Sequence, residues 1–318
     1  MLTIAYFAAK LGEGGFGAVY KVMRTSSKEE YAMEVEVTKA ADPMLKMEVA
    51  VFKTVGNTKV SQPHVCQYVE SGSTSLFAYL VMQLVGRSLA DLRRACPDGR
   101  FTGSTTARLG LQALEAIEAL HRIGFLHRDI KPANFAMGRS GALQRNVYLL
   151  DFGLARQYVT RDGQMRPPRN AAGFRAGSAA VEEGQGGERR KCQSLPALPH
   201  RSVPLCVRVM KKKKYTTPEV LLKGMEKEYR AMMKDLEGLK FLDAPNYSWY
   251  QKQLRSVMGR KKYSDEDPFD WEEGGEGFES VMQSAIAPDP YQKKEKADKK
   301  VVKEKIEGKE KSGEDIEE

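Results

Sequence analysis

The spacing of apolar residues predicts a mixture of strands and helices in the first half of the chain. Four stretches have the alternating or continuous apolar character of strands: Met1–Ala9, Ala18–Tyr20, Val147–Leu150 and the beginning of Tyr79–Leu92, which continues into a hinge and a helix start. Helical spacing occurs twice, around Val51 and Phe52 and over Thr105–Gly124. We expect the longer helix to deliver the chain into the loop that follows it.

The second half of the chain has weaker patterns. Residues 176–210 have no sustained periodicity and run into Gly, Pro, Arg and Lys, which predicts a disordered insert. From about residue 288 the chain is dominated by Lys and Glu. That composition is typical of a solvated, flexible tail, with a coiled-coil or docking helix as the alternative.

Composition and charge restrict the class of protein. The chain has 318 residues with 41% hydrophobic residues, and its net charge is +9. Nine Lys or Arg and no acid fall within residues 189–214, but no aromatic RNA-binding motif or zinc spacing accompanies them, so we do not expect nucleic-acid binding. The four cysteines form no CxxC pair, and no apolar run reaches the ~20 residues of a membrane span. We expect a monomer that does not bind membranes and that is found in the cytoplasm, or in both the cytoplasm and the nucleus.

The chain is organised around the loop from His127 to Gly138, which fits the pattern H-R-D-x-x-x-x-N. Asp129 can orient a substrate hydroxyl and accept its proton, and Lys131 can neutralise charge on a moving phosphoryl group. Asn134, five residues after the aspartate, can hold a metal ion on the phosphates. The alternative is a solvated loop with a helix cap, which the accompanying motifs make much less plausible.

A glycine-rich loop lies between Leu11 and Tyr20 and has the pattern G-x-G-x-x-G-x-V. Its three glycines, Gly12, Gly14 and Gly17, let the backbone turn and approach phosphates closely. The residues after it, from Ala18 on, are strand formers rather than helix formers. This favours a hairpin over ATP instead of a dinucleotide-binding turn.

The position 17 residues after Gly17 carries an unexpected side chain. The pattern V-A-I-K places a phosphate-pairing lysine there, whereas this chain has Glu34. Glu48 occupies the position of the helix glutamate that would pair with the lysine. Two carboxylates ~4 Å apart repel each other by roughly 4 kcal/mol at an effective dielectric of about 20, and protonation of Glu34 would relieve this. Lys21 or Lys39 is the alternative source of the missing positive charge.

The Tyr79–Leu92 stretch offers the adenine contacts. We expect Met82 to screen the back of the pocket, and the backbones of Gln83 and Val85 to bond adenine. Ala32 suits the roof of the pocket. The helix start has two polar residues, Ser88 and Asp91, which we expect to cap it, and Asp91 can also reach the ribose.

Several segments together resemble the casein kinase 1 superfamily, and within it the tau-tubulin kinase branch. The residues that carry the resemblance are Leu45–Val51, Val81–Leu84, Leu89–Arg94, Gly124–Gly138, Leu149–Tyr158 and Arg166–Arg175. The match covers roughly residues 8–175 and is highly specific. It resumes at Tyr215–Gly224 and in pieces up to Pro268–Glu272.

The resemblance implies an α+β bilobal fold that uses ATP and Mg²⁺ to phosphorylate Ser or Thr of a protein. Substrates would be acidic, already phosphorylated or cytoskeletal. It implies that Asp129 is the base, that Asn134 and Asp151 hold the metal, and that Leu11, Val19 and the glycines cover the nucleotide. The implied boundaries are a small lobe over 1–84, the start of the large lobe over 85–175, the basic insert over 176–214, a remnant of the last helices over 215–275, and a tail over 276–318.

The chain departs from that family after Arg175. The family continues with a substrate-groove motif and a long buried helix, which residues 176–214 do not match. We therefore predict a disrupted large lobe and strongly impaired catalysis. Three interpretations follow: a Ser/Thr kinase, a pseudokinase or scaffold that binds nucleotide at most, and a truncated product that does not fold stably.

Overall fold

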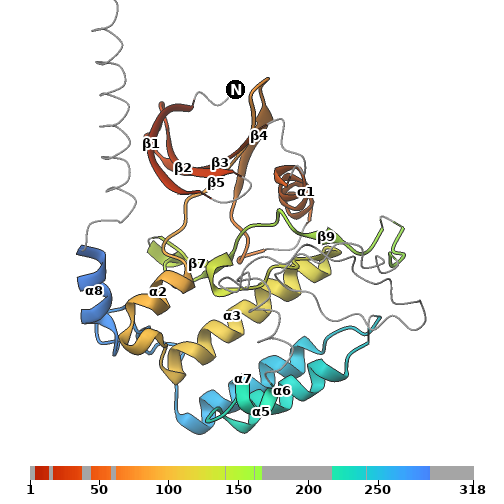
Figure 1. Ribbon diagram of the computed structural model, residues 1–318, viewed down its shortest axis with the longest axis vertical. Helices are drawn as coiled ribbons and strands as arrows, with labels where there is room; N and C mark the ends of the chain where they lie inside the picture. The colour runs from red at the N-terminus through yellow and green to blue at the C-terminus, as the bar shows by residue number, and fades with distance from the viewer. Residues whose placement is uncertain are drawn as a thin grey trace, which may run out of the picture. The chain divides into compact units, whose positions relative to one another are not determined.

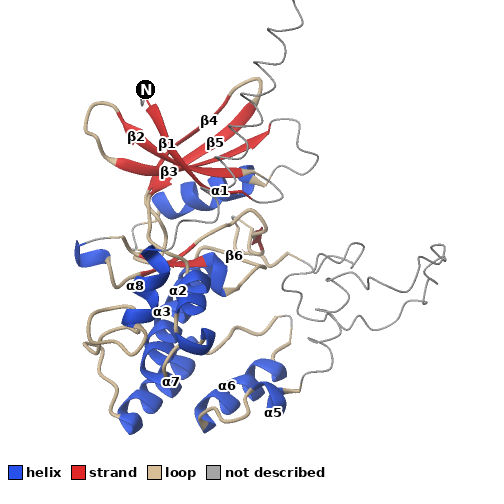
Figure 2. Cartoon of the chain, turned by 60° about the vertical axis from the view of Figure 1, so that its left-hand side comes forward, coloured by secondary structure: helices blue, strands red, loops and turns tan. Residues whose placement is uncertain are grey.

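An antiparallel sheet of five strands opens the chain (Figures 1 and 2). The computed structural model describes residues 4–13, 17–37, 44–58, 62–139, 141–160, 162–166, 217–240 and 242–286. The strand order is β1-β2-β3-β5-β4. The strands are β1 (Ile4–Glu13), β2 (Ala18–Arg24), β3 (Glu30–Val37), β4 (Tyr68–Ser73) and β5 (Phe77–Gln83). The first strand extends four residues beyond the predicted Met1–Ala9, because β1 pairs with β2 as far as Glu13.

The two faces of this sheet carry different side chains. Val22, Met33 and Val81 pack together on one face and are buried. Alternation along β3 turns Glu34 and Glu36 to the other face, where helix α1 (Leu45–Gly56) lies. Val51 and Phe52, at the centre of the apolar pattern predicted for this helix, are buried. The helix thus covers the face of the sheet that carries the two glutamates.

The helical part of the first unit is built on helix α3 (Gly103–Arg122), which packs along α7 (Tyr247–Lys261). Their contact is apolar and is made by Ala107, Leu111, Leu254 and Met258. Helices α5 (Pro218–Leu221) and α6 (Lys227–Gly238) precede α7. Helix α3 ends two residues before the predicted Gly124, which has a φ of 84° and so cannot continue a right-handed helix.

Two short strand pairs flank the predicted catalytic loop. β6 (Phe125–Leu126) precedes the loop and pairs with β9 (Arg156–Gln157). β7 (Phe135–Met137) follows it and pairs with β8 (Val147–Leu149), which confirms the strand expected before Asp151. Both ends of the loop are therefore held by backbone hydrogen bonds.

The chain divides into two units, of which the second consists of Leu92–Thr102 and the chain from Pro268 onward. Helix α2 (Leu89–Ala95) crosses the boundary between the units in the sequence. Within the second unit, Asp270 is buried and accepts hydrogen bonds from the backbone N and the hydroxyl of Thr102, both at 2.7 Å. Helix α8 (Phe278–Ile286) lies where we expected the flexible tail to begin, so the tail boundary at residue 276 is placed too early.

Several expectations fall outside the described residues. They concern the basic insert over 176–214, the chain beyond Ile286, Lys39 and Gly14. The disrupted large lobe stays a prediction for the same reason. Within the part of the chain that the structure describes, no helix is both long and apolar enough to cross a membrane.

We expect Leu254→Ala to lower the free energy of unfolding by about 2–5 kcal/mol, because it opens a cavity between α3 and α7. Leu254 is 2% exposed and lies in the core of that contact. Leu236, which is 47% exposed on α6, provides the matched control: Leu236→Ala should change stability by less than about 0.5 kcal/mol. Urea unfolding measures both variants. Equal losses would mean that the α3–α7 contact is not part of the folded core.

Candidate active site

Asp129 is the centre of the loop between β6 and β7. Its carboxylate is buried, and its Oδ2 contacts the ammonium of Lys131 and accepts a hydrogen bond of 3.1 Å from Nδ2 of Asn134. Nδ2 of Asn134 also donates to the backbone oxygen of Asp129, at 2.9 Å. The structure therefore brings the three predicted residues together. Among the described residues, none donates to the other carboxylate oxygen of Asp129, which is left for a substrate hydroxyl.

His127 fixes the backbone of this loop. Its Nδ1 accepts from the backbone N of Asp129 at 3.2 Å, so the proton lies on Nε2, which donates to the backbone oxygen of Leu150 at 3.0 Å. Burial lowers the pKa of the imidazole and keeps it neutral. Arg128 has a φ of 68°, and its Nε donates to the backbone oxygen of Leu154 at 2.7 Å. The loop is thereby tied on both sides to the segment that carries Asp151.

Asp151 also has a left-handed backbone, with a φ of 64°. Such a conformation costs a non-glycine residue free energy, and it is often kept at functional sites. Its carboxylate is exposed and accepts a long hydrogen bond of 3.4 Å from the backbone N of Gly153. Asp151 and Asn134 both offer oxygen atoms, which suit a hard cation such as Mg²⁺.

The described residues offer few side chains that could serve as metal ligands. No group of three or more His, Cys, Asp or Glu in the described ranges is arranged to hold a metal ion. This fits Mg²⁺ bound together with a nucleotide, because such an ion takes one or two protein carboxylates and completes its shell with phosphates and water.

Four rings form an aromatic column from the sheet to the catalytic loop. The centroid distances are 6.4 Å from Tyr68 to Phe52, 5.7 Å from Phe52 to Phe152 and 5.5 Å from Phe152 to His127. Phe52 and Phe152 meet edge to face at 87°, a favourable arrangement for aromatic pairs. The column couples helix α1 to the loop that holds Asp129. Sequence analysis identified Phe52 only as a buried residue of the helix.

Glu34 and Glu48 face each other, and a hydrogen bond joins their carboxyl groups. Such a bond requires a proton on one of them. Burial and the charge of Asp151 raise the pKa of Glu34 to about 7, while burial and the neighbouring Glu34 raise the pKa of Glu48 well above its usual value. Glu48, fully buried, therefore holds the shared proton. We had expected it on Glu34, which is less buried.

Lys21, the proposed substitute that the structure describes, does not supply the positive charge that is missing beside Glu34. Nζ of Lys21 pairs with Glu30 at 2.8 Å. Glu30 also contacts the guanidinium of Arg139, which follows β7. Lys21 is thus committed to an ion pair at the start of β3, and it does not neutralise Glu34.

Small and apolar side chains line the expected adenine pocket. Ala32 and Met82 are register partners on β3 and β5 and are 7% and 8% exposed. Val19 is the register partner of Glu34 on the neighbouring strand β2. Ala136 of β7 is buried and bridges to the residue that starts helix α2.

At the hinge, one backbone group of Gln83 is already bonded, and the expected adenine contacts of its carbonyl and of Val85 stay predictions. The backbone N of Gln83 donates to the backbone oxygen of Gln67 at 2.9 Å, so this N–H is not available to adenine. Val85 is half-buried. Next to it, the backbone N of Gly86 donates to the oxygen of Met137 at 2.7 Å, which joins the hinge to β7. The pairing of the Gln83 amide with Gln67, the residue before β4, could not be predicted from the sequence.

Ser88 caps helix α2 as expected. Its hydroxyl accepts from the backbone N of Asp91 at 3.1 Å and donates to the Asp91 carboxylate at 2.6 Å. The contact of Asp91 with a ribose stays a prediction.

The glycine-rich loop is described only in part. Gly12 on β1 is the register partner of Val19, and Leu11 beside it is 46% exposed. A Cβ on Gly17 would lie 2.2 Å from the backbone oxygen of Val35, so this position accepts only glycine. Strand β2 begins at Ala18, as a hairpin over the nucleotide requires.

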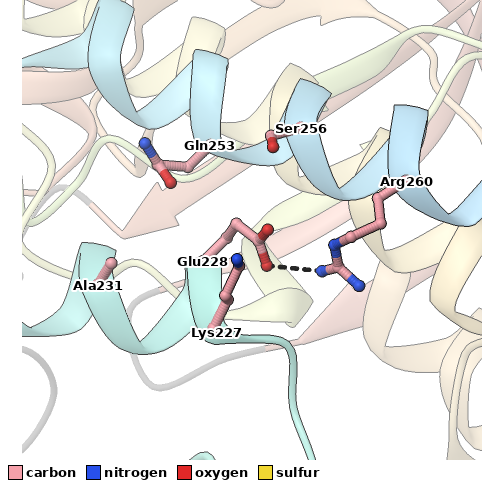
Figure 3. Close-up of a pocket in the computed structure, with 6 residues that line it drawn as sticks. All are labelled: Lys227, Glu228, Ala231, Gln253, Ser256 and Arg260. Atoms are coloured by element: carbon pink, nitrogen blue, oxygen red, sulfur yellow. Dashed lines mark hydrogen bonds and ion pairs between the residues drawn. The ribbon is translucent and has the colours of Figure 1, made fainter.

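A separate pocket of about 470 Å³ lies between α6 and α7 (Figure 3). Gln253, Ser256 and Arg260 line it from α7, and Lys227, Glu228 and Ala231 line it from α6. The guanidinium of Arg260 is paired with Glu228 at 2.7 Å and with Glu226 at 2.9 Å. None of the predicted site residues lines this pocket, so it is not the nucleotide site.

The Glu34–Glu48 pair predicts a pH-dependent stability. The folded chain holds a proton that the unfolded chain releases near pH 4.5, so the free energy of unfolding should fall as pH rises from about 5 through about 7. Glu34→Gln removes the part of this loss that comes from Glu34, while the buried Glu48 keeps its own contribution. Urea unfolding at pH 5, 6, 7 and 8 measures it as the difference between the two proteins. A constant difference across this range would contradict the shared proton.

Known proteins match the chain over most of its length. A model of the protein kinase domain matches residues 6–176, more than half of the chain. A probable serine/threonine-protein kinase of Dictyostelium discoideum is 34% identical over 278 residues, which cover 83% of this chain and 55% of that protein. The chain thus spans little more than half of that relative's length.

A second relative is matched over more of its own length. A putative serine/threonine-protein kinase of Caenorhabditis elegans is 36% identical over 283 residues, 83% of this chain and 80% of that protein. These matches agree with the sheet, the helices and the Asp129 loop described above. The chain belongs to the protein kinase family and has its bilobal α+β fold.

Proposed function

We propose that the chain is a protein serine/threonine kinase of casein kinase 1 or tau-tubulin kinase type whose catalysis is slow. The observation that carries this proposal is the arrangement of Lys131 and Asn134 around the carboxylate of Asp129. The names of both relatives support the substrate class of Ser and Thr hydroxyls. The segments from Gly124 to Tyr158 support the casein kinase 1 superfamily. The tau-tubulin kinase branch is supported by Leu45–Val51, Val81–Leu84, Leu89–Arg94 and Arg166–Arg175.

In this proposal the γ-phosphoryl group passes from ATP to a substrate hydroxyl, and ADP leaves. Asp129 orients the hydroxyl and takes its proton as the new oxygen–phosphorus bond forms. Lys131 neutralises charge on the phosphoryl group. Asn134 and Asp151 would hold Mg²⁺, which neutralises charge on the phosphates when it is bound.

Glu34 supports slow rather than normal turnover. In protein kinases a lysine at this position pairs with the helix glutamate and positions the phosphates. Here a carboxyl group with a pKa of about 7 occupies the position, and it is partly ionised near neutral pH. Its negative charge repels the α- and β-phosphates instead of binding them.

The substrate and the compartment are part of the proposal. The family resemblance supports a cytoskeletal or acidic protein as substrate, and a monomer that works in the cytoplasm or the nucleus.

A pseudokinase that binds nucleotide at most is the second candidate, and the Glu34–Glu48 pair is the observation that favours it. The same residue thus separates the two functions. A slow kinase tolerates Glu34, whereas a pseudokinase has lost turnover for that reason or for lack of a substrate groove.

We expect Glu34→Lys to raise kcat/KM for casein phosphorylation by about tenfold or more, because it restores a cation beside Glu48. Asp129→Asn should abolish activity in either background, a loss of about 10²- to 10⁴-fold. Radiolabelled phosphate transfer measures all four proteins. Strong activity of the unchanged chain that Asp129→Asn removes would refute slow catalysis. No activity in any variant would favour the pseudokinase.

Binding can be tested without turnover. Mg-ATP should raise the melting temperature of the purified chain in a concentration-dependent way, because a ligand selective for the folded state stabilises it by mass action. The shift should be larger for Glu34→Lys. A cooperative melt that nucleotide leaves unchanged in both proteins would exclude the kinase and indicate a pseudokinase or scaffold that does not bind nucleotide.

A further inference from the structure

Glu36 is a buried carboxylate that the proposed chemistry does not use. It lies on β3, two residues after Glu34, and is 4% exposed. Its Oε1 accepts from the backbone N of Met44 and its Oε2 from the backbone N of Leu45, both at 2.9 Å. Both carboxylate oxygens are thus occupied by amides at the start of helix α1.

These bonds meet a need of the helix. The first amides of a helix have no partner within it, and the cap residue Met44 supplies no side-chain acceptor. A carboxylate at this end is also favoured by the helix dipole. The acceptor comes from the sheet and not from the residue next to the helix. Glu36 therefore caps the N-terminus of α1 and also fixes the position of the helix on β3.

The same stretch of sheet and helix holds the Glu34–Glu48 pair. Glu48 follows Leu45 by three residues, less than one helical turn, and Glu34 and Glu36 point to the same face of β3. In place of an ion pair, a shared proton joins Glu34 to the helix. That link weakens once the proton is lost, whereas Glu36 remains bonded to two amides.

We propose that Glu36 is the positioning residue that holds helix α1 against the sheet in place of the missing lysine–glutamate ion pair. This inference rests on the proposed function in one respect: α1 borders the nucleotide site. Held this way, α1 keeps Phe52 on Phe152 and so keeps the aromatic column closed.

The first arm of the test is hydrogen exchange. In Glu36→Ala, amide exchange should accelerate by about tenfold over the whole of α1, because the helix leaves the sheet. Glu36→Gln keeps a neutral acceptor and should give a smaller change. Glu29→Gln is the control: it removes a carboxylate of the turn between β2 and β3, which accepts from Ser27 and Tyr31 and not from α1. Acceleration confined to Leu45–Glu48 would mean a helix cap only and would overturn the proposal.

The second arm is the affinity for Mg-ADP, measured by calorimetry. Glu36→Ala should raise Kd by about tenfold in the unchanged chain, and by less than about threefold in the Glu34→Lys background. The restored ion pair keeps the competent position of α1 almost fully populated there, so the loss of Glu36 lowers this population only slightly. An equal loss in both backgrounds, or no loss, would overturn the proposal. If no variant binds Mg-ADP, the proposed function fails, and the exchange profile alone decides the role of Glu36.

Discussion

The proton shared by Glu34 and Glu48 is the constraint on which the rest of the site depends. Two ionised carboxylates could not remain this close in a buried place without a large energetic cost. One of them must stay neutral, and the fully buried Glu48 is the one that does. Near neutral pH the site therefore has a partial negative charge, on Glu34, where a protein kinase normally has a balanced ion pair.

The remaining architecture does not depend on that pair. Asp129 is held by Lys131 and Asn134, and the backbone of its loop is held by His127. These bonds lie within the loop and its flanking strands. The aromatic column then connects the loop to α1 through apolar contact, which does not change with the charge of position 34. A charge reversal at the nucleotide site can thus coexist with an intact catalytic loop.

Much of this site could be predicted from the sequence, because its spacing is local. The positions of Asp129, Lys131 and Asn134 follow from one short loop, and the facing of Glu34 and Glu48 follows from a motif and a helix pattern. What could not be predicted depends on contacts between distant segments. The bond from the Gln83 amide to Gln67 needs the strand pairing.

Two further features also needed the structure. The proton on Glu48 depends on relative burial, which one sequence does not give. The capping of α1 by Glu36 depends on where the first residues of α1 lie relative to β3. In both cases the residues could be identified from the sequence, but the groups that they contact could not. The extent of helix α8 was missed because a charged, glycine-rich surrounding concealed a short apolar pattern.

The contact of Arg139 with Glu30 is an ion pair that salt can weaken. Glu30 belongs to the sheet and Arg139 to the turn after β7, so the pair joins the two sides of the site independently of the hinge. Both side chains are partly exposed, at 30% and 47%, and dissolved ions therefore screen their attraction. Ionic strength therefore weakens this link between β3 and the segment that follows β7.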